Sequence, residues 1–204
     1  MLGKLIVIEG LDGCGKSTLA RALQEQISEK YPVQLYAEPG GTDTGDLICQ
    51  ILKDPALDIN RHAEALLFAA ARAQLAEQVR SDLQSGIWVI LDRWLYSSIA
   101  YQGTARDLGA EDIRNINHWA VEDIQVDAWF YLHLTPEQAA IRRQQRSQKI
   151  DRIEAEGLEF FTKVSESYQY QADQDPKAIV LSAELEPEAL AQQAMLQLEV
   201  LLEL

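Results

Sequence analysis

An α/β fold, with a parallel β-sheet covered by helices on both faces, is the structure that the sequence predicts. Short apolar runs alternate with helical patterns along the chain, and the runs are apolar at nearly every position. Strands buried on both faces show such continuous runs, whereas half-exposed strands alternate. Polar motifs follow three of the runs directly. Because the carboxyl ends of parallel strands share one edge, where ligands bind in these sheets, we expect these motifs to converge.

Five apolar runs are predicted to be strands, and the stretches between and after them to be helices. The strands are Leu5 to Glu9, Val33 to Ala37, Trp88 to Asp92, Ala128 to Leu134 and Ala178 to Leu181. The helices are Lys16 to Lys30, Ala63 to Ser85, Ala110 to Val126, Pro136 to Gln148, Arg152 to Ala172 and Pro187 to Leu202. In the last helix an apolar stripe that suits packing on a sheet recurs at Leu190, Ala194, Leu198 and Leu201.

The turn after the first strand reads GLDGCGKST. It fits the phosphate-binding pattern G-x-x-x-x-G-K-[ST], and the strand before it and the helix after it argue against a chance glycine-rich turn. Glycines there let successive backbone N–H groups cradle an anion. We expect Lys16 to reach the terminal phosphates and the Ser17 hydroxyl to bind Mg²⁺. The residues expected to bind a nucleoside triphosphate are Gly10, Leu11, Asp12, Gly13, Cys14, Gly15, Lys16, Ser17 and Thr18.

Composition excludes several classes of function. The chain has 204 residues, 47% of them hydrophobic and 25% charged, and a net charge of −14. Such acidity disfavours nucleic-acid binding, which depends on Lys and Arg that neutralise phosphates. No apolar run has the length of a membrane span, and no leader precedes the first strand, so we expect a cytoplasmic protein with no membrane partner. Two cysteines give no disulfide framework, and three scattered histidines give no metal pattern.

Basic residues gather in one short segment. Five of the 18 Lys and Arg are Arg142, Arg143, Arg146, Lys149 and Arg152. In an acidic chain this cluster suggests a local anion site. A solvated basic helix face is the alternative from composition alone.

Two further motifs follow predicted strands. After the second strand comes EPGGT, from Glu38 to Thr42, which could also be a purely structural turn. After the third comes Asp92-Arg93. A carboxylate there is a usual partner of phosphate-bound Mg²⁺, and an arginine can hold a phosphate bidentately. A salt bridge at a strand end is the alternative, but the edge that the pair shares with Lys16 favours a binding role.

The second predicted helix carries Phe68 and Arg72 on one face, one turn apart. The ring could stack on a base and the guanidinium could reach a carbonyl or phosphate. An aromatic residue at helical spacing is more often part of the core. Polar side chains that could contact a small ligand then follow at Ser97, Ser98, Tyr101 and Gln102.

Together these motifs resemble the bacterial thymidylate kinases essentially from end to end. The segments that carry the resemblance are GLDGCGKST, EPGGT, FAAAR, DRW, SSIAYQG and IDRIE, in that order. The resemblance implies transfer of the γ-phosphoryl group of ATP to dTMP, which gives dTDP and ADP. It also implies the P-loop NTPase three-layer fold with a five-stranded parallel sheet, a short mobile lid at about residues 142–152, one domain over residues 1–204, and a homodimer.

Residue roles follow from the resemblance. Lys16, Arg93 and Arg146 correspond to catalytic residues, with Arg152 as the second choice for the lid arginine, and Arg143 to an ATP contact. Ser17 and Asp92 correspond to Mg²⁺ ligands. Asp12 matches a contact to the sugar 3′-hydroxyl, Phe68 a thymine-stacking ring and Arg72 a contact to a thymine carbonyl. The full set expected at dTMP is Asp12, Glu38, Pro39, Phe68, Arg72, Arg93, Ser98, Tyr101 and Gln102.

The chain departs from the family pattern at three positions. Many members have arginine where Ala37 stands and tyrosine where Ala69 stands. Some place a catalytic arginine at the position of Gly13, and its absence resembles the class that supplies this arginine from the lid.

Three alternatives remain at this point. They are a kinase of another nucleoside monophosphate or of a nucleoside, a GTPase, and a non-catalytic nucleotide-binding protein. The chain has no N-K-x-D guanine-binding motif, which disfavours the GTPase.

Overall fold

The computed structural model describes residues 2–145 and 150–203, and within them a five-stranded parallel sheet in the order β2-β3-β1-β4-β5. The strands are β1 (Leu5–Gly10), β2 (Val33–Ala37), β3 (Trp88–Asp92), β4 (Ala128–His133) and β5 (Ala178–Ser182). Strands β1 and β3 are buried at every position, which is why their sequences are apolar except for Glu9, Gly10 and Asp92 at their carboxyl ends. The predicted parallel sheet is confirmed.

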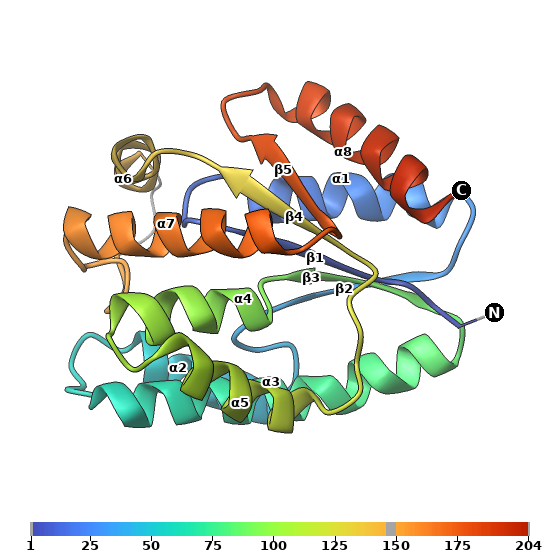
Figure 1. The fold of residues 1–204 in the computed structure, drawn as a ribbon. Coiled ribbons are helices and arrows are strands. Elements are labelled where there is room, and N and C mark those ends of the chain that lie inside the picture. The colour runs from blue at the N-terminus through green and yellow to red at the C-terminus, as the bar shows by residue number, and fades with distance from the viewer. Residues whose placement is uncertain (1, 146–149, 204) are drawn as a thin grey trace.

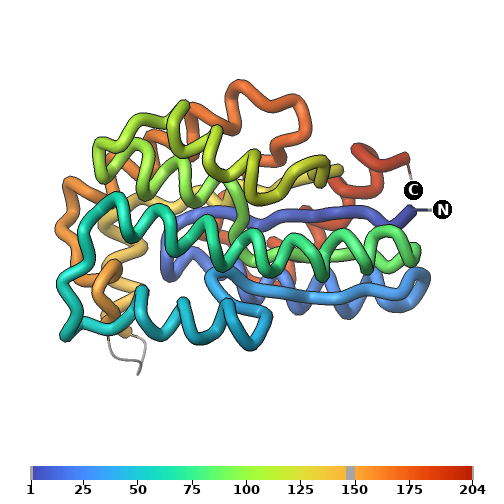
Figure 2. Tube along the Cα trace, turned by 90° about the horizontal axis from the view of Figure 1, so that it is seen from below, coloured from blue at the N-terminus to red at the C-terminus, as the bar shows by residue number. Residues whose placement is uncertain are grey.

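Helices cover both faces of the sheet (Figure 1). Their bounds are α1 (Lys16–Ser28), α2 (Asp43–Lys53), α3 (Arg61–Gln84), α4 (Leu95–Ser98), the π-helix η1 (Ile99–Ala105), α5 (Ala110–Val121), α6 (Pro136–Gln144), α7 (Leu158–Gln174) and α8 (Pro187–Leu202). Helices α1 and α8 lie on one face, and α3, α4 and α5 on the other. Both chain ends lie on the side opposite the carboxyl ends of the strands (Figure 2).

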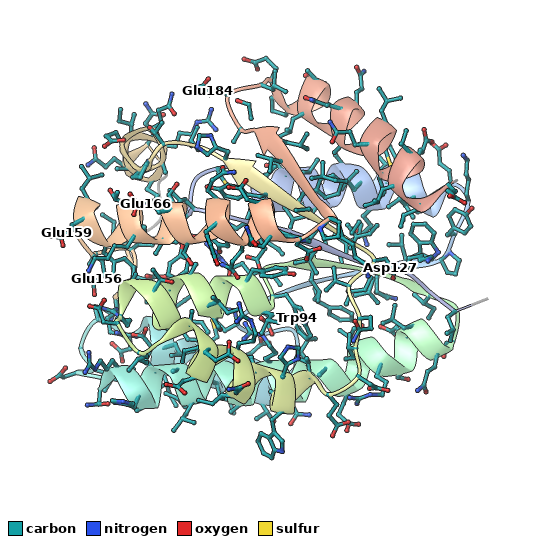
Figure 3. The ribbon with its side chains drawn as sticks, viewed as in Figure 1. Trp94, Asp127, Glu156, Glu159, Glu166 and Glu184 are labelled. Carbon is teal, nitrogen blue, oxygen red and sulfur yellow. The ribbon has the colours of Figure 1, made fainter. Side chains whose placement is uncertain are left out.

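Apolar side chains lie mainly in the interior and charged side chains mainly on the surface, as the hydrophobic effect predicts. Trp94 lies in the interior and is only 1% exposed, whereas Glu159, Glu166 and Glu184 project outward (Figure 3). No helix in the described part of the chain combines the length and the apolar character needed to span a bilayer.

Helix α2 lies in a stretch for which the sequence analysis predicted no helix. Its sequence does contain end signals, since the Thr42 side chain accepts a hydrogen bond from Gly45 N at 3.0 Å and Asp43 and Asp46 occupy the first turn. Leu47, Ile48, Ile51 and Leu52 also recur at helical spacing, a signal that the sequence analysis did not use, although only Gly45 and Leu52 of this helix are buried.

The predicted helix from Arg152 begins instead at Leu158. Residues 152–155 form a separate turn, in which Asp151 Oδ1 accepts hydrogen bonds from Ile153 N and Glu154 N at 2.9 and 2.8 Å as an N-cap does, and Gly157 is the N-cap of α7. The predicted helix from Ala110 ends at Val121, where Glu122 takes a left-handed φ of 53°. The predicted helix from Pro136 is described only as far as Gln144.

Candidate active site

The glycine-rich turn joins β1 to α1 at the carboxyl edge of the sheet. Gly15, the N-cap of α1, has φ 97°, and Gly13 has φ 94°, a region that side chains disfavour. A Cβ on Gly13 would also lie 3.0 Å from the Ala139 carbonyl oxygen of α6. The loop therefore accepts no larger residue at Gly13 without strain, which fits the absence of an arginine there.

Lys16 is held inside this turn. Its side chain is 6% exposed and Nζ donates to the Leu11 carbonyl at 2.9 Å. Asp12 Oδ1 lies 3.8 Å from the same ammonium. The ammonium is thus ordered against the loop, at the amino end of α1, where an anion is favoured.

Ser17 and Asp92 meet across neighbouring strands. Their parent segments are adjacent because β1 and β3 pair with Ile8 opposite Asp92. The Ser17 hydroxyl donates to Asp92 Oδ2 at 2.5 Å. Two hard oxygen ligands together suit Mg²⁺, which is commonly held by one or two protein oxygens and by substrate phosphates. Among the described residues, no group of three or more His, Cys, Asp or Glu could form a dedicated metal cage.

Arg93 is held at this edge by several side chains. Its φ is 77°, a strained value of the kind that clusters at functional sites. Nη2 donates to Asp12 Oδ1 at 2.7 Å, and Nη1 donates to Ser97 Oγ at 3.0 Å and to the Tyr168 hydroxyl at 3.1 Å. Its guanidinium lies 5.2 Å from the centre of the Tyr101 ring. Burial would lower the pKa of Arg93, but Asp12 and the other facing groups raise it well above its ordinary value.

Glu9 is a buried residue of this site that sequence reasoning missed. It is fully buried and accepts hydrogen bonds from Trp94 N at 2.9 Å and from the hydroxyls of Ser97 and Tyr168 at 2.6 and 3.0 Å. Burial raises the pKa of its carboxyl despite these donors. The two hydroxyls that accept from Arg93 therefore donate to Glu9. The only signal in the sequence was a charged residue inside an apolar run.

Arg72 of α3 is 1% exposed, and all five of its N–H donors have protein partners. Nε and Nη2 donate to Glu38 Oε2 at 2.9 and 2.6 Å, and Nη2 also donates to the Trp94 carbonyl at 3.0 Å. Nη1 donates to Ser98 Oγ at 2.7 Å and to Asn117 Oδ1. A ligand carbonyl that bonds this guanidinium must replace one of these partners. Asn117, on α5, belongs to no motif, so sequence analysis missed it.

Glu38 follows β2, and its peptide bond to Pro39 is cis. Burial raises the pKa of its carboxyl to about 7, against the opposing effect of Arg72. Its second oxygen, Oε1, is buried and has no hydrogen-bond partner within the described residues. The Glu38–Arg72 pair therefore forms part of the cavity lining, and Glu38 Oε1 can accept a hydrogen bond from a ligand.

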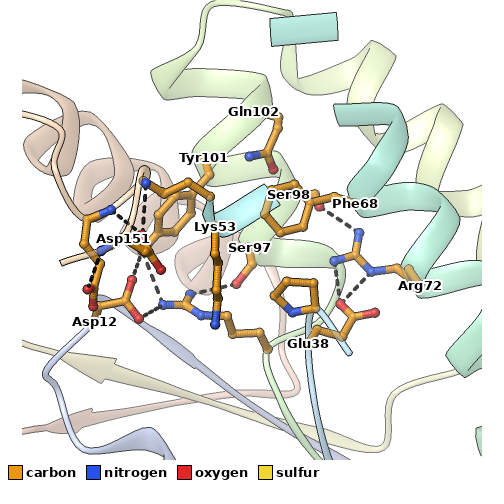
Figure 4. Close-up of a pocket in the computed structure, with 14 residues that line it drawn as sticks. Asp12, Glu38, Lys53, Phe68, Arg72, Ser97, Ser98, Tyr101, Gln102 and Asp151 are labelled. Atoms are coloured by element: carbon orange, nitrogen blue, oxygen red, sulfur yellow. Dashed lines mark hydrogen bonds and ion pairs between the residues drawn. The ribbon is translucent and has the colours of Figure 1, made fainter. Parts of the chain in front are cut away.

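One cavity of about 360 Å³ contains every residue predicted to contact dTMP (Figure 4). Phe68 is half-buried, lines this cavity and is absent from the buried core, so the structure contradicts the core alternative for this ring. The other predicted residues in the lining are Asp12, Glu38, Pro39, Arg72, Arg93, Ser98, Tyr101 and Gln102. Ser97, which the sequence analysis named as a possible ligand contact without assigning it to dTMP, also lines the cavity. Four lining residues were not predicted as ligand contacts, namely Lys53, Asp151, Ile153 and Glu154.

A second cavity, of about 510 Å³, lies over the glycine-rich turn. Its lining includes Lys16, Ser17, Thr18 and Asp92. The two cavities share Asp12, Glu38, Lys53 and Arg93. The two cavities therefore meet at these four residues, which we call the junction, and one ligand can be bound on each side of it.

The predicted lid arginines have different surroundings. Arg146 lies outside the described residues. Arg152 donates to Glu64 Oε2 at 2.7 Å and to the Leu52 carbonyl at 3.0 Å, so it faces α2 and α3 in this structure. Arg143 donates to the Asp12 carbonyl at 3.3 Å and lies 4.1 Å from the centre of the Phe161 ring. Arg143 thus touches the glycine-rich turn, whereas Arg152 does not reach it.

Glu64 joins Arg152, in the segment predicted to be a lid, to Gln102 of the cavity lining. Its carboxylate is 1% exposed and accepts from Gln102 Nε2 at 2.9 Å, as well as from Arg152 and Arg106. Burial would raise the pKa of Glu64, but these donors lower it below its ordinary value. Gln102 is therefore held by α3, and one of its donors is already engaged.

Known proteins resemble this chain over most of its length. Residues 8–194 match the sequence profile described as thymidylate kinase. The chain is 41% identical to a thymidylate kinase of Caldanaerobacter subterraneus subsp. tengcongensis over 183 residues, 89% of this chain and 87% of that protein. It is 38% identical to a thymidylate kinase of Legionella pneumophila (strain Corby) over 187 residues, which cover 90% and 88% of the two chains. A thymidylate kinase of Thermosipho africanus is 42% identical over 165 residues, 80% and 81% of the two chains.

Proposed function

The chain belongs to the thymidylate kinase family and is a dTMP kinase, and we propose how its residues divide the transfer of the γ-phosphoryl group of ATP to dTMP. Its sheet and helices form the P-loop NTPase fold of that family. ATP occupies the cavity over the glycine-rich turn and dTMP the cavity lined by Phe68. The observation that supports this assignment is the junction at Asp12 and Arg93, which belong to both cavities.

On the donor side, the turn from Gly10 to Thr18 holds the triphosphate. Backbone N–H groups in such turns bind phosphate oxygens, and Lys16 neutralises charge on the terminal phosphates. Ser17 and Asp92 would hold Mg²⁺, which neutralises phosphate charge when it is bound. Arg143, already at the turn, contacts ATP, and Arg146 remains the proposed catalytic arginine of the lid.

On the acceptor side, Arg93 binds the phosphate of dTMP. Phe68 stacks on thymine, and Arg72 and Ser98 bond the edge of the base. Asp12 contacts the 3′-hydroxyl, with Glu38 and Pro39 forming the wall beside it and Tyr101 and Gln102 closing the sugar side. No general base is required, because a phosphate monoester is already an anionic nucleophile, and catalysis rests on position and charge.

A homodimer in the cytoplasm is the proposed state of the protein. The layer formed by α2, α3 and α5 carries exposed apolar side chains, with Trp119 83% and Leu66 57% exposed. Apolar residues of this size on a surface often mark an interface. Sedimentation should give twice the mass of one chain, and Trp119→Glu should reduce it to the mass of one chain.

We also propose that residues 1–204 form one domain, with a lid at about residues 142–152.

The decisive experiment is an acceptor panel. The protein is incubated with Mg-ATP and with dTMP, dUMP, UMP, CMP, AMP, GMP or thymidine, and ADP formation is measured. We expect the highest kcat/KM with dTMP. Turnover of another monophosphate with dTMP left unreacted would contradict the assignment, and a strong preference for GTP over ATP would favour a different nucleotide-binding class.

A further inference from the structure

We propose that Lys53, the last residue of α2, is a phosphate-binding residue that contacts the acceptor phosphate of dTMP. This inference rests on the proposed function. Lys53 lines both cavities and so belongs to the junction where the phosphoryl group passes between the two ligands. Figure 4 shows its side chain extending into the acceptor cavity between Asp12 and Glu38.

The other basic side chains of the two cavities have protein partners. Arg72 is bonded to Glu38, Arg93 to Asp12, Lys16 to the Leu11 carbonyl and Arg142 to the Ala183 carbonyl at 2.8 Å. The Lys53 ammonium has no hydrogen bond or ion pair within residues 2–145 and 150–203. Lys53 is therefore the cation of the described lining that can bind a ligand without giving up a partner.

Charge balance at the junction gives the same assignment. Asp12 offsets the charge of Arg93, and Glu38, when ionised, offsets that of Arg72. The phosphate of dTMP carries close to two negative charges near neutral pH, and binding it in a partly enclosed cavity requires a cation beside it. The other two carboxylates of the acceptor lining, Asp151 and Glu154, accept hydrogen bonds from backbone N–H groups of their own turn. Lys53 is the cation of the junction that pairs with no carboxylate among the described residues.

The backbone at Lys53 is fixed although its side chain is exposed. The Lys53 carbonyl accepts from Arg152 N at 3.4 Å, and the preceding Leu52 carbonyl accepts from Arg152 Nε at 3.0 Å. Arg152 is in turn paired with the buried Glu64. The end of α2 is thus tied to α3 and to the base of the lid, so the ammonium starts from a defined place at the mouth of both cavities.

The test compares ligands with and without a phosphate. Binding of dTMP and of thymidine is measured by titration calorimetry for the wild type, Lys53→Met and Lys53→Arg. Lys30→Met, at an exposed lysine outside both cavities, is the matched control. We expect Lys53→Met to weaken dTMP about tenfold to one-hundredfold, the usual effect of losing a charged hydrogen bond, with thymidine unchanged. Lys53→Arg should keep most of the affinity, and Lys30→Met all of it.

Two results would overturn the inference. One is an unchanged dTMP affinity in Lys53→Met, and the other is an equal loss for dTMP and thymidine, which would indicate a change in cavity shape. Either result leaves the proposed function intact as long as the wild type phosphorylates dTMP. A wild type that does not phosphorylate dTMP would contradict the proposed function itself.

Discussion

The donor and acceptor halves of the site are built in different ways. The proposed donor half rests mainly on one continuous turn, residues 10–18, which supplies backbone N–H groups, Lys16 and Ser17, with Asp92 of β3 and Arg142 of α6 beside it. The proposed acceptor half is assembled mainly from side chains that follow β2 and β3 and from α3, α4 and η1, and several of those side chains bond one another without a ligand. A substitution in the donor half should therefore affect catalysis, whereas one in the acceptor half should affect both stability and affinity.

This difference shows which contacts order each half of the site. Backbone groups held by a strand and a helix are ordered by local structure, so the turn needs little support from elsewhere. Side chains drawn from several elements are ordered only by their neighbours, so Arg72 needs Glu38, Ser98 and Asn117. The following predictions test that division, from the largest effect to the smallest.

Replacing Lys16 with alanine should give the largest effect. The substitution removes the ammonium that neutralises the terminal phosphates, and we expect kcat to fall about 10³-fold, as for loss of other charge-stabilising groups. The melting temperature should change little, because the lysine bonds only the adjacent turn within the described contacts. Lys163→Ala, on α7 and outside both cavities, is the control. Near-normal turnover in Lys16→Ala would contradict the proposed donor site.

Replacing Arg72 with methionine should destabilise the fold and abolish tight dTMP binding. The substitution leaves Glu38 buried without its partner, and we expect urea unfolding to show a loss of about 3 kcal/mol. Adding Glu38→Gln replaces the unpaired carboxyl with an amide that does not ionise and should recover part of that stability without restoring affinity. If Arg72→Met were as stable as the wild type, the paired side chains would not support the acceptor half.

Glu38 should make stability depend on pH in an unusual direction. Its pKa is raised to about 7 by burial, against an ordinary value of 4.5. Between these values the folded chain binds more protons at this residue than the unfolded chain, so its contribution to the free energy of unfolding falls as pH rises from 4.5 to 7. The difference between wild type and Glu38→Gln, measured by urea unfolding from pH 5 to 8, should fall by up to about 3 kcal/mol. A constant difference would show that Arg72 keeps Glu38 ionised throughout.

Replacing Phe68 with alanine should give the smallest of these effects. Loss of a ring that stacks on a base weakens binding by about 1 to 3 kcal/mol in other proteins, so KM for dTMP should rise about tenfold while KM for ATP stays constant. Stability should change little, because the ring lies outside the buried core. Phe68→Tyr, which keeps the aromatic plane, is the matched control. A large loss of stability with unchanged KM would restore a packing role.

Helix α2 shows where sequence reasoning failed. Glycine and proline in EPGGT indicated a turn, and the helical spacing of Leu47, Ile48, Ile51 and Leu52 after it was overlooked. The sequence analysis therefore did not predict that Lys53 lies at the end of a helix or at the junction. Tyr168 and Asn117 were missed for another reason, since each lies on a helix with an ordinary buried face and meets its arginine only in the folded chain.

The sequence by itself determined the parallel sheet, the nucleotide-binding turn and the residue types of the acceptor cavity. Each depends on local order, such as continuous apolar runs, glycine spacing, or a motif that follows a strand directly. Only the tertiary structure decided which side chains meet. Arg72 finds Glu38 and Asn117, Arg93 finds Asp12 and Tyr168, and Lys53 arrives at the junction without a partner among the described residues. These contacts depend on how helices far apart in the chain pack on one sheet. The spacing of residues along the sequence does not give the distances between such helices.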